Sequence, residues 1–99
     1  MNAGPGLIQV LEETRAWLAL ADNDFVWSSW EDATEALAEM DGLLERARAA
    51  PLDSRDLLTL AVLYAPTGPI QEVSLNSGWS KEYLGLAERM DRALEQARH

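Results

Sequence analysis

The stretch SRDLLTLAVLY, residues 54–64, decides the fold. From Leu57 onward every side chain except Thr59 is apolar or aromatic, so a helix formed here has almost no polar face. A helix that is apolar all round is normally buried inside a protein. The sequence therefore predicts a helix over residues 54–64, and we expect it to be the central element on which the other helices pack.

The residues just before this stretch signal a helix start. Pro51 ends whatever precedes it, because proline cannot continue a helix. Asp53 can accept a hydrogen bond from a first-turn amide, and Leu52 can pack against Leu57 as a hydrophobic staple. We therefore predict a capped helix that begins at Ser54.

The connection over residues 66–79 follows it. Residues 66–69, PTGP, break the helix, because glycine and proline both disfavour its continuation. Pro69 suits the first position of a short helix that Gly78 would close. A strand over residues 70–75 is the alternative, but a single strand has no partner here. A short helix is the prediction, and a connection this long could also hold a binding surface.

Two amphipathic helices are predicted upstream, over residues 7–20 and from about 28 to 49. Ser28 and Glu31 fit a capping box for the second helix. Gly42 interrupts it, at about 1 kcal/mol of helix propensity, yet the apolar stripe continues in phase past it. The stripes consist of Leu7, Leu11, Thr14, Leu18 and Ala21 in the first helix, and of Trp30, Ala33, Leu37, Met40, Leu44 and Ala47 in the second.

A last helix is predicted over residues 81–96. Ser80 is its expected N-cap, and Trp79 its expected staple against Leu84. The predicted fold class is therefore all-α, a compact bundle of four main helices plus one short helix in the 66–79 connection. Residues 1–6 are expected to be a flexible tail, and residues 7–99 a single helical domain.

The chain lacks the usual residues of catalysis and metal binding. It has no cysteine, and its one histidine is His99, the last residue printed. Residues 22–24, DND, begin like a calcium loop but lack its glycine and its twelfth-position carboxylate. We therefore expect no catalytic residues, cofactor or metal, and no enzyme activity. We also expect neither a signal peptide nor a membrane span, and a cytoplasmic location.

The net charge of −9 is unevenly distributed. Residues 12–45 contain ten acids and one base, Arg15, whereas residues 46–99 contain seven of each. Such a field repels phosphate backbones and anionic lipids and attracts basic partners. The expectation is a basic protein partner, with no nucleic acid and no membrane.

The four tryptophans are predicted to differ in role. Trp17 and Trp30 lie on or beside apolar stripes and are expected in the core. Trp27 and Trp79 flank helix starts and are expected to be half exposed, where they could anchor a partner.

Three functional interpretations follow. The first is a protein-binding module of the inhibitor, immunity or adaptor type, which meets a basic partner surface through Glu31, Asp32, Glu35, Glu39, Trp27 and Trp79. Residues Glu31, Glu35 and Glu39 could otherwise be an ordinary solvated helix face. The second is a small-ligand-binding or enzymatic protein with a pocket near Tyr64, Trp79 and Tyr83. The third is a self-associating structural protein, a homodimer that covers the apolar helix.

Overall fold

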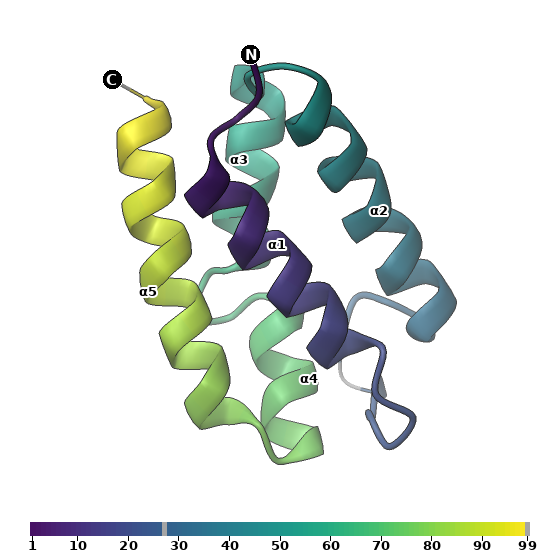
Figure 1. Ribbon diagram of the computed structural model, residues 1–99. Helices are drawn as coiled ribbons and strands as arrows, with labels where there is room; N and C mark the ends of the chain where they lie inside the picture. The colour runs from purple at the N-terminus through teal and green to yellow at the C-terminus, as the bar shows by residue number, and fades with distance from the viewer. Residues whose placement is uncertain (27, 99) are drawn as a thin grey trace.

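The computed structural model describes residues 1–26 and 28–98, over which the chain forms five helices and no strand (Figure 1). The helices are α1 (Pro5–Leu18), α2 (Ala33–Ala49), α3 (Ser54–Leu63), α4 (Pro69–Ser77) and α5 (Ser80–Ala97). The all-α prediction is confirmed. The predicted division into four main helices and one short helix does not match the helix lengths. Helix α4, the predicted short one, has nine residues, and α3 has only ten.

Helix α1 is buried more fully than the helix of residues 54–64, which the sequence placed at the centre. It packs against α2 on one side and α5 on the other (Figure 1). Leu7, Val10, Leu11 and Leu18 are all at most 2% exposed. The fourteen residues of α1, flanked by the two longest helices, bury more apolar area than a ten-residue helix can, and stabilisation scales with that area.

The prediction that the 54–64 helix is central is wrong. In α3 only Leu60 and Leu63 are buried, while Leu58 is 64% and Val62 57% exposed. Helix α3 lies behind α1 in Figure 1 and contacts α5. The apolar side chains of α3 therefore lie partly on a buried face and partly on a face that other helices leave exposed.

The start of α2 also differs from the prediction. The helix begins at Ala33, and Asp32 is its N-cap, with a carboxylate oxygen that accepts from the Glu35 amide at 3.0 Å. The hydroxyl of Ser28 instead bonds within the preceding loop, where it donates to the Phe25 carbonyl at 2.9 Å. Trp30 is 4% exposed, and its burial before the first turn delays the helix. Once begun, α2 continues through position 42 as predicted.

The other helix ends largely follow the sequence signals. Asp53 caps α3 by accepting from the Asp56 amide at 2.8 Å, as predicted. Helix α4 begins at Pro69 and is closed by Gly78, whose φ of 85° is left-handed. The predicted Ser80 cap is wrong: Ser80 is the first residue of α5, and no side chain caps this helix.

Helix α1 begins at Pro5, inside the segment expected to be a tail. The Ala3 amide donates to the Ala47 carbonyl of α2 at 2.8 Å, and the Gly4 amide donates to the Asn2 side chain. None of the helices in the described ranges is both long enough and apolar enough to cross a membrane.

Candidate functional site

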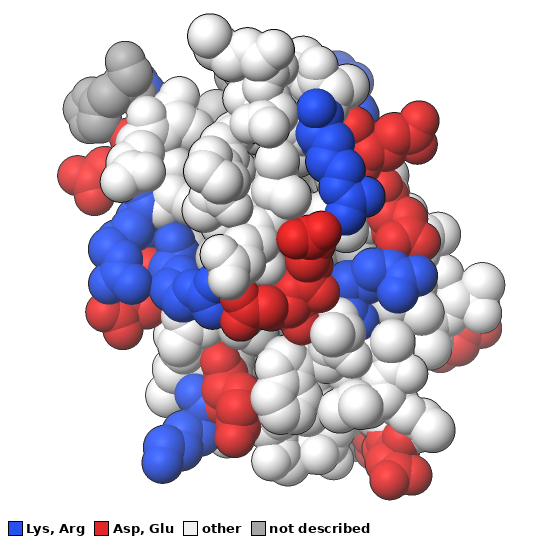
Figure 2. Space-filling view, viewed as in Figure 1, with Lys and Arg blue, Asp and Glu red and all other residues white. Residues whose placement is uncertain are grey.

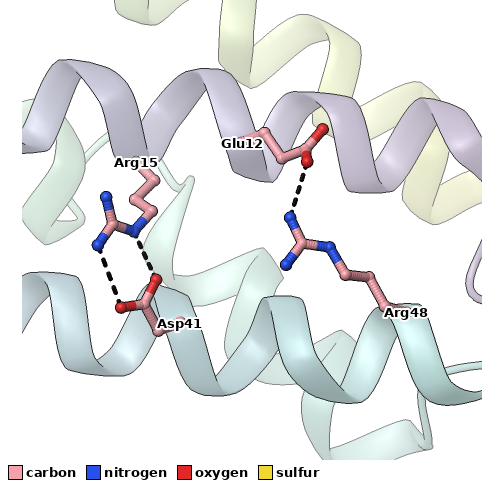
Figure 3. Close-up of polar contacts among 4 residues, drawn as sticks. All are labelled: Glu12, Arg15, Asp41 and Arg48. Atoms are coloured by element: carbon pink, nitrogen blue, oxygen red, sulfur yellow. Dashed lines mark hydrogen bonds and ion pairs between the residues drawn. The ribbon is translucent and has the colours of Figure 1, made fainter.

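Two ion pairs join α1 to α2 and remove part of the predicted charge imbalance (Figure 3). An Arg48 nitrogen lies 2.7 Å from a Glu12 carboxylate oxygen. Arg15 forms two hydrogen bonds to Asp41, which raise the pKa of the guanidinium and lower the pKa of the carboxyl. Each helix supplies one acid and one base, so the interface is electrically balanced.

A third pair joins α1 to α5. Both oxygens of Glu13 accept from Arg89, at 2.6 and 2.8 Å, and this contact holds the pKa of the Glu13 carboxyl below its usual value. Figure 2 shows the outcome: blue and red side chains are interleaved on the face formed by α1 with α2 and α5. The acids of α1 are therefore paired with arginines, whereas seven of the eight acids in residues 22–45, all but Asp41, lie outside these three pairs.

Within that segment, four exposed carboxylates surround the start of α2; we call Glu31, Asp32, Glu35 and Glu39 the acidic surface. In the part of the chain that the structure describes, none of them is in an ion pair. The sequence has no Lys or Arg between Arg15 and Arg46. The seven steps from Asp32 to Glu39 rise about 10 Å along the axis, roughly one Debye length, so the four potentials add.

The acidic surface also has a local structural role. Besides the Asp32 cap, a Glu35 oxygen accepts from the Glu31 amide at 3.4 Å. Carboxylates near a helix N-terminus interact favourably with its positive end. This accounts for part of the acid content, but every one of these groups keeps its charge exposed to solvent.

Buried aromatic side chains anchor the loop before α2. Phe25 is 9% and Trp30 4% exposed, so the expectation that Trp30 lies in the core is confirmed. The Trp30 indole nitrogen donates to Glu39 at 3.3 Å, and Asp24 accepts from the Val26 amide at 2.9 Å. The loop is thereby held against the core next to the acidic surface.

Trp79 is 2% exposed, so the expectation of a half-exposed partner anchor is wrong for it. Its rings stack on Trp17 with centroids 5.4 Å apart and planes 19° apart. Its indole nitrogen donates to the Asn23 oxygen at 2.8 Å, and the Asn23 amide group donates to the Trp17 carbonyl at 2.6 Å. Trp17 is partly buried against the core. Trp27, the other expected anchor, lies outside the described residues, as does His99.

An open groove of about 830 Å³ lies between α3 and α5, near the position that the second interpretation expected. Tyr64 and Tyr83 line it, but Trp79 does not. The Tyr83 hydroxyl donates to the carbonyls of Tyr64 and Ala65, at 3.0 and 3.1 Å. The Tyr64 hydroxyl donates to Thr14 in the core at 2.7 Å.

Neither tyrosine is suited to proton transfer near neutral pH. Burial raises the pKa of Tyr64 far above its ordinary value, and burial with the nearby charge of Asp91 raises the pKa of Tyr83. Across residues 1–26 and 28–98, no three His, Cys, Asp or Glu side chains lie close enough together to hold a metal ion. The groove therefore offers shape and surface charge more than reactive groups.

Sequence reasoning missed an exposed apolar side chain that lines this groove, Leu84, and two more on α3 beside the lining residue Ala61, Leu58 and Val62. Leu58 and Val62 of α3 and Leu84 of α5 were assigned to a buried helix or a staple, whereas each is more than half exposed. The signal was present in residues 54–64, since a helix without a polar face either is buried or leaves apolar surface uncovered.

No family model matches this chain, and neither a curated protein nor a solved structure matches it.

Proposed function

We propose that this chain is a protein-binding module whose acidic surface meets a basic surface on a partner protein, as inhibitor, immunity-type or adaptor proteins do. The observation that carries the proposal is the set of four exposed carboxylates at the start of α2, in a segment without any Lys or Arg from residue 16 to residue 45. Exposed charge of one sign speeds association with the opposite sign and disfavours wrong partners.

The anchored loop supports the same proposal. The buried side chains of Phe25 and Trp30 attach the described residues just before α2 to the core, which supports carboxylates that are arranged before a partner arrives. A surface that is already ordered loses less conformational entropy on binding. Trp79 is left out of the proposed surface, because its buried indole has almost no area to offer.

We propose binding rather than catalysis because the chain has no cysteine and only the terminal His99, and because both groove tyrosines have raised pKa values. The partner is proposed to be a protein and not a nucleic acid or a membrane, since phosphate groups would be repelled. A cytoplasmic location belongs to the same proposal, and the absence of cysteine supports it.

The test is affinity capture from the native cell with mass spectrometry, followed by kinetics with the captured protein. The test variant is Glu31→Gln/Glu35→Gln/Glu39→Gln, which removes three charges but keeps oxygen acceptors. The control is Asp53→Asn/Glu72→Gln/Glu82→Gln, which also removes three carboxylates at or near helix starts.

We expect the wild type and the control to capture the same basic protein. The test variant should associate with it several-fold more slowly, with the largest difference at low salt, because screening weakens the steering force. Failure to capture any protein at low or moderate salt would refute the proposal. Equal association rates for the test and control variants would refute it as well.

A further inference from the structure

The α3 wall of the groove carries an uncovered apolar stripe. In α3, Ala61 and Val62 lie three and four residues after Leu58, spacings that place the three on one side of the helix, and Ala65 follows two residues past the helix end. Ala61 and Ala65 line the groove, and the two larger side chains beside them, Leu58 and Val62, are 64% and 57% exposed. Exposed apolar area of this kind marks a surface that gains stability when a partner covers it.

The α5 wall is of a different character. Leu84, which is 63% exposed, and Ala87 form an apolar end. Further along the same wall come the carboxylates of Asp91 and Glu95, and that of Glu88, which is paired with Arg92 at 3.1 Å. Among the described residues, Arg98 is the one base that lines the groove, and it is the C-cap residue that follows α5. The α3 wall is thus apolar, and the α5 wall is mainly acidic.

The length of the groove suits a helix. From Leu84 to the C-cap residue Arg98, this wall spans fifteen residues, which are fourteen steps along the helix. At 1.5 Å per residue this wall is about 21 Å long, or about four turns of a helix laid alongside it.

We propose that this groove binds an amphipathic helix of a partner protein, with its apolar stripe against α3 and a Lys- or Arg-bearing flank against the carboxylates of α5. Helices that bind in grooves present apolar side chains at i, i+3, i+4 and i+7, and a cationic flank complements an acidic wall. The inference goes beyond the acidic surface, because the groove lies on α3 and α5 and shares no residue with it.

Hydrogen bonds connect the two sides of the groove. The Tyr83 hydroxyl bonds to the Tyr64 and Ala65 carbonyls, which ties α5 to the end of α3. These bonds already use the hydroxyl of Tyr83, and the Tyr64 hydroxyl points to Thr14 instead. Small-ligand sites rely on a few convergent polar groups, so this arrangement favours a helix over a small ligand.

A second copy of the chain fits the groove less well. Each copy carries a net charge of −9. In a symmetric dimer built on this groove, the carboxylates of the two α5 walls would come together, and their repulsion would oppose the apolar contact.

The experiment measures fluorescence anisotropy with a labelled Leu/Lys peptide of about 16 residues, long enough for four turns, whose leucines follow the i, i+3, i+4, i+7 pattern. Two control peptides have the same length: one is a scrambled sequence of identical composition, and the other replaces every Lys with Glu. Wild-type protein should bind the patterned peptide at least about tenfold more tightly than either control. That factor corresponds to the burial of one Leu or Val side chain.

Protein variants locate the binding. Leu58→Gln/Val62→Gln should weaken binding by about tenfold or more, and Asp91→Asn/Glu95→Gln by several-fold. Leu75→Gln, at a 55% exposed leucine of α4, which is neither α3 nor α5, should leave the affinity unchanged. Circular dichroism of each variant checks that the exposed positions tolerate the change.

Three outcomes would overturn the inference. Equal affinity for the patterned and scrambled peptides would show that binding depends on the net charge of the peptide and not on an apolar helix face. Unchanged affinity in Leu58→Gln/Val62→Gln would place binding elsewhere. If the wild type sediments as a dimer and this variant as a monomer, the groove binds a second copy of the chain instead. The variant Glu31→Gln/Glu35→Gln/Glu39→Gln should leave peptide affinity within about twofold, since it lies outside the groove, so the two proposals can fail separately.

Discussion

The hydroxyl pair that crosses the core gives a quantitative test of this packing. The Tyr64 hydroxyl, at the end of α3, donates to the Thr14 hydroxyl of α1 at 2.7 Å, and Thr14 in turn donates to the Val10 carbonyl at 2.8 Å. Thr14 is fully buried and Tyr64 is 3% exposed. Water therefore cannot replace a lost partner without entering the core.

The variant Thr14→Val keeps the shape of the side chain and removes the acceptor. It leaves the Tyr64 hydroxyl buried without a partner, which should lower the free energy of unfolding by about 1–3 kcal/mol. Tyr64→Phe removes the donor instead, and Thr14 keeps its bond to Val10, so the expected loss is about 0.5–1.5 kcal/mol. The double variant leaves no hydroxyl stranded and should cost about as much as Tyr64→Phe alone.

The measurement is urea unfolding of the four proteins, followed by tryptophan fluorescence and circular dichroism. The sum of the losses in unfolding free energy in the two single variants should exceed the loss in the double variant by about 1 kcal/mol or more. Thr59→Val is the matched control, because Thr59 makes a similar bond to the Arg55 carbonyl in an exposed setting. Its effect should stay within about 0.5 kcal/mol. Additive losses, or a Thr14→Val loss no larger than that of Thr59→Val, would refute the reasoning.

Three further outcomes are expected from the structure. Gly85→Ala should raise stability in urea unfolding by about 0.5–1 kcal/mol, because the added Cβ meets nothing within 4 Å and helix interiors favour alanine; a loss would contradict this. Gly68→Ala should lower the melting temperature clearly, because its Cβ would lie 2.5 and 2.8 Å from two carbonyl oxygens of α3; an unchanged melting temperature would show that the turn can relax. Because the pKa of Glu13 is lowered below its ordinary 4.5 in the folded chain, its pairing with Arg89 stabilises the fold above that value and is lost as the pH falls through the folded pKa. The acid side of a melting-temperature profile should therefore be flatter in Glu13→Gln, and identical profiles would argue against the pair.

The features that the sequence predicted well are local ones. The helical period continues in phase through Gly42, and α2 does not break there. Asp53, Pro69 and Gly78 act where their own backbone chemistry requires. Each depends on contacts within a few residues, and such contacts are visible in a linear sequence.

The start of α2 shows where local rules compete. Ser28 with Glu31 and Asp32 with Glu35 both fit a polar cap followed by a carboxylate three residues on. The burial of Trp30 decides in favour of the later one, and burial is a tertiary property. The same holds for Ser80, where the neighbouring Trp79 is fixed by its stack on Trp17.

The arrangement of the helices could not be predicted in this way. Composition shows that α3 is apolar, but not that its neighbours cover only one of its sides. The ion pairs that neutralise α1 join residues 26, 36 and 76 positions apart, so no local spacing signals them. Both proposed surfaces therefore depend on the tertiary structure, which determines which apolar side chains are covered and which charges are paired.

Folding sorts the charge of this chain into two kinds. The acids of α1 are balanced by arginines of α2 and α5, whereas the acidic surface has no such partner in the described structure. Its field extends about 8 Å into physiological salt, so it acts before contact and governs how fast a basic partner arrives. The stripe on α3 has no such reach, because burial of apolar area stabilises only at contact and so lengthens the life of a complex. A partner that carried basic residues together with an amphipathic helix would use both effects, on surfaces that share no residue.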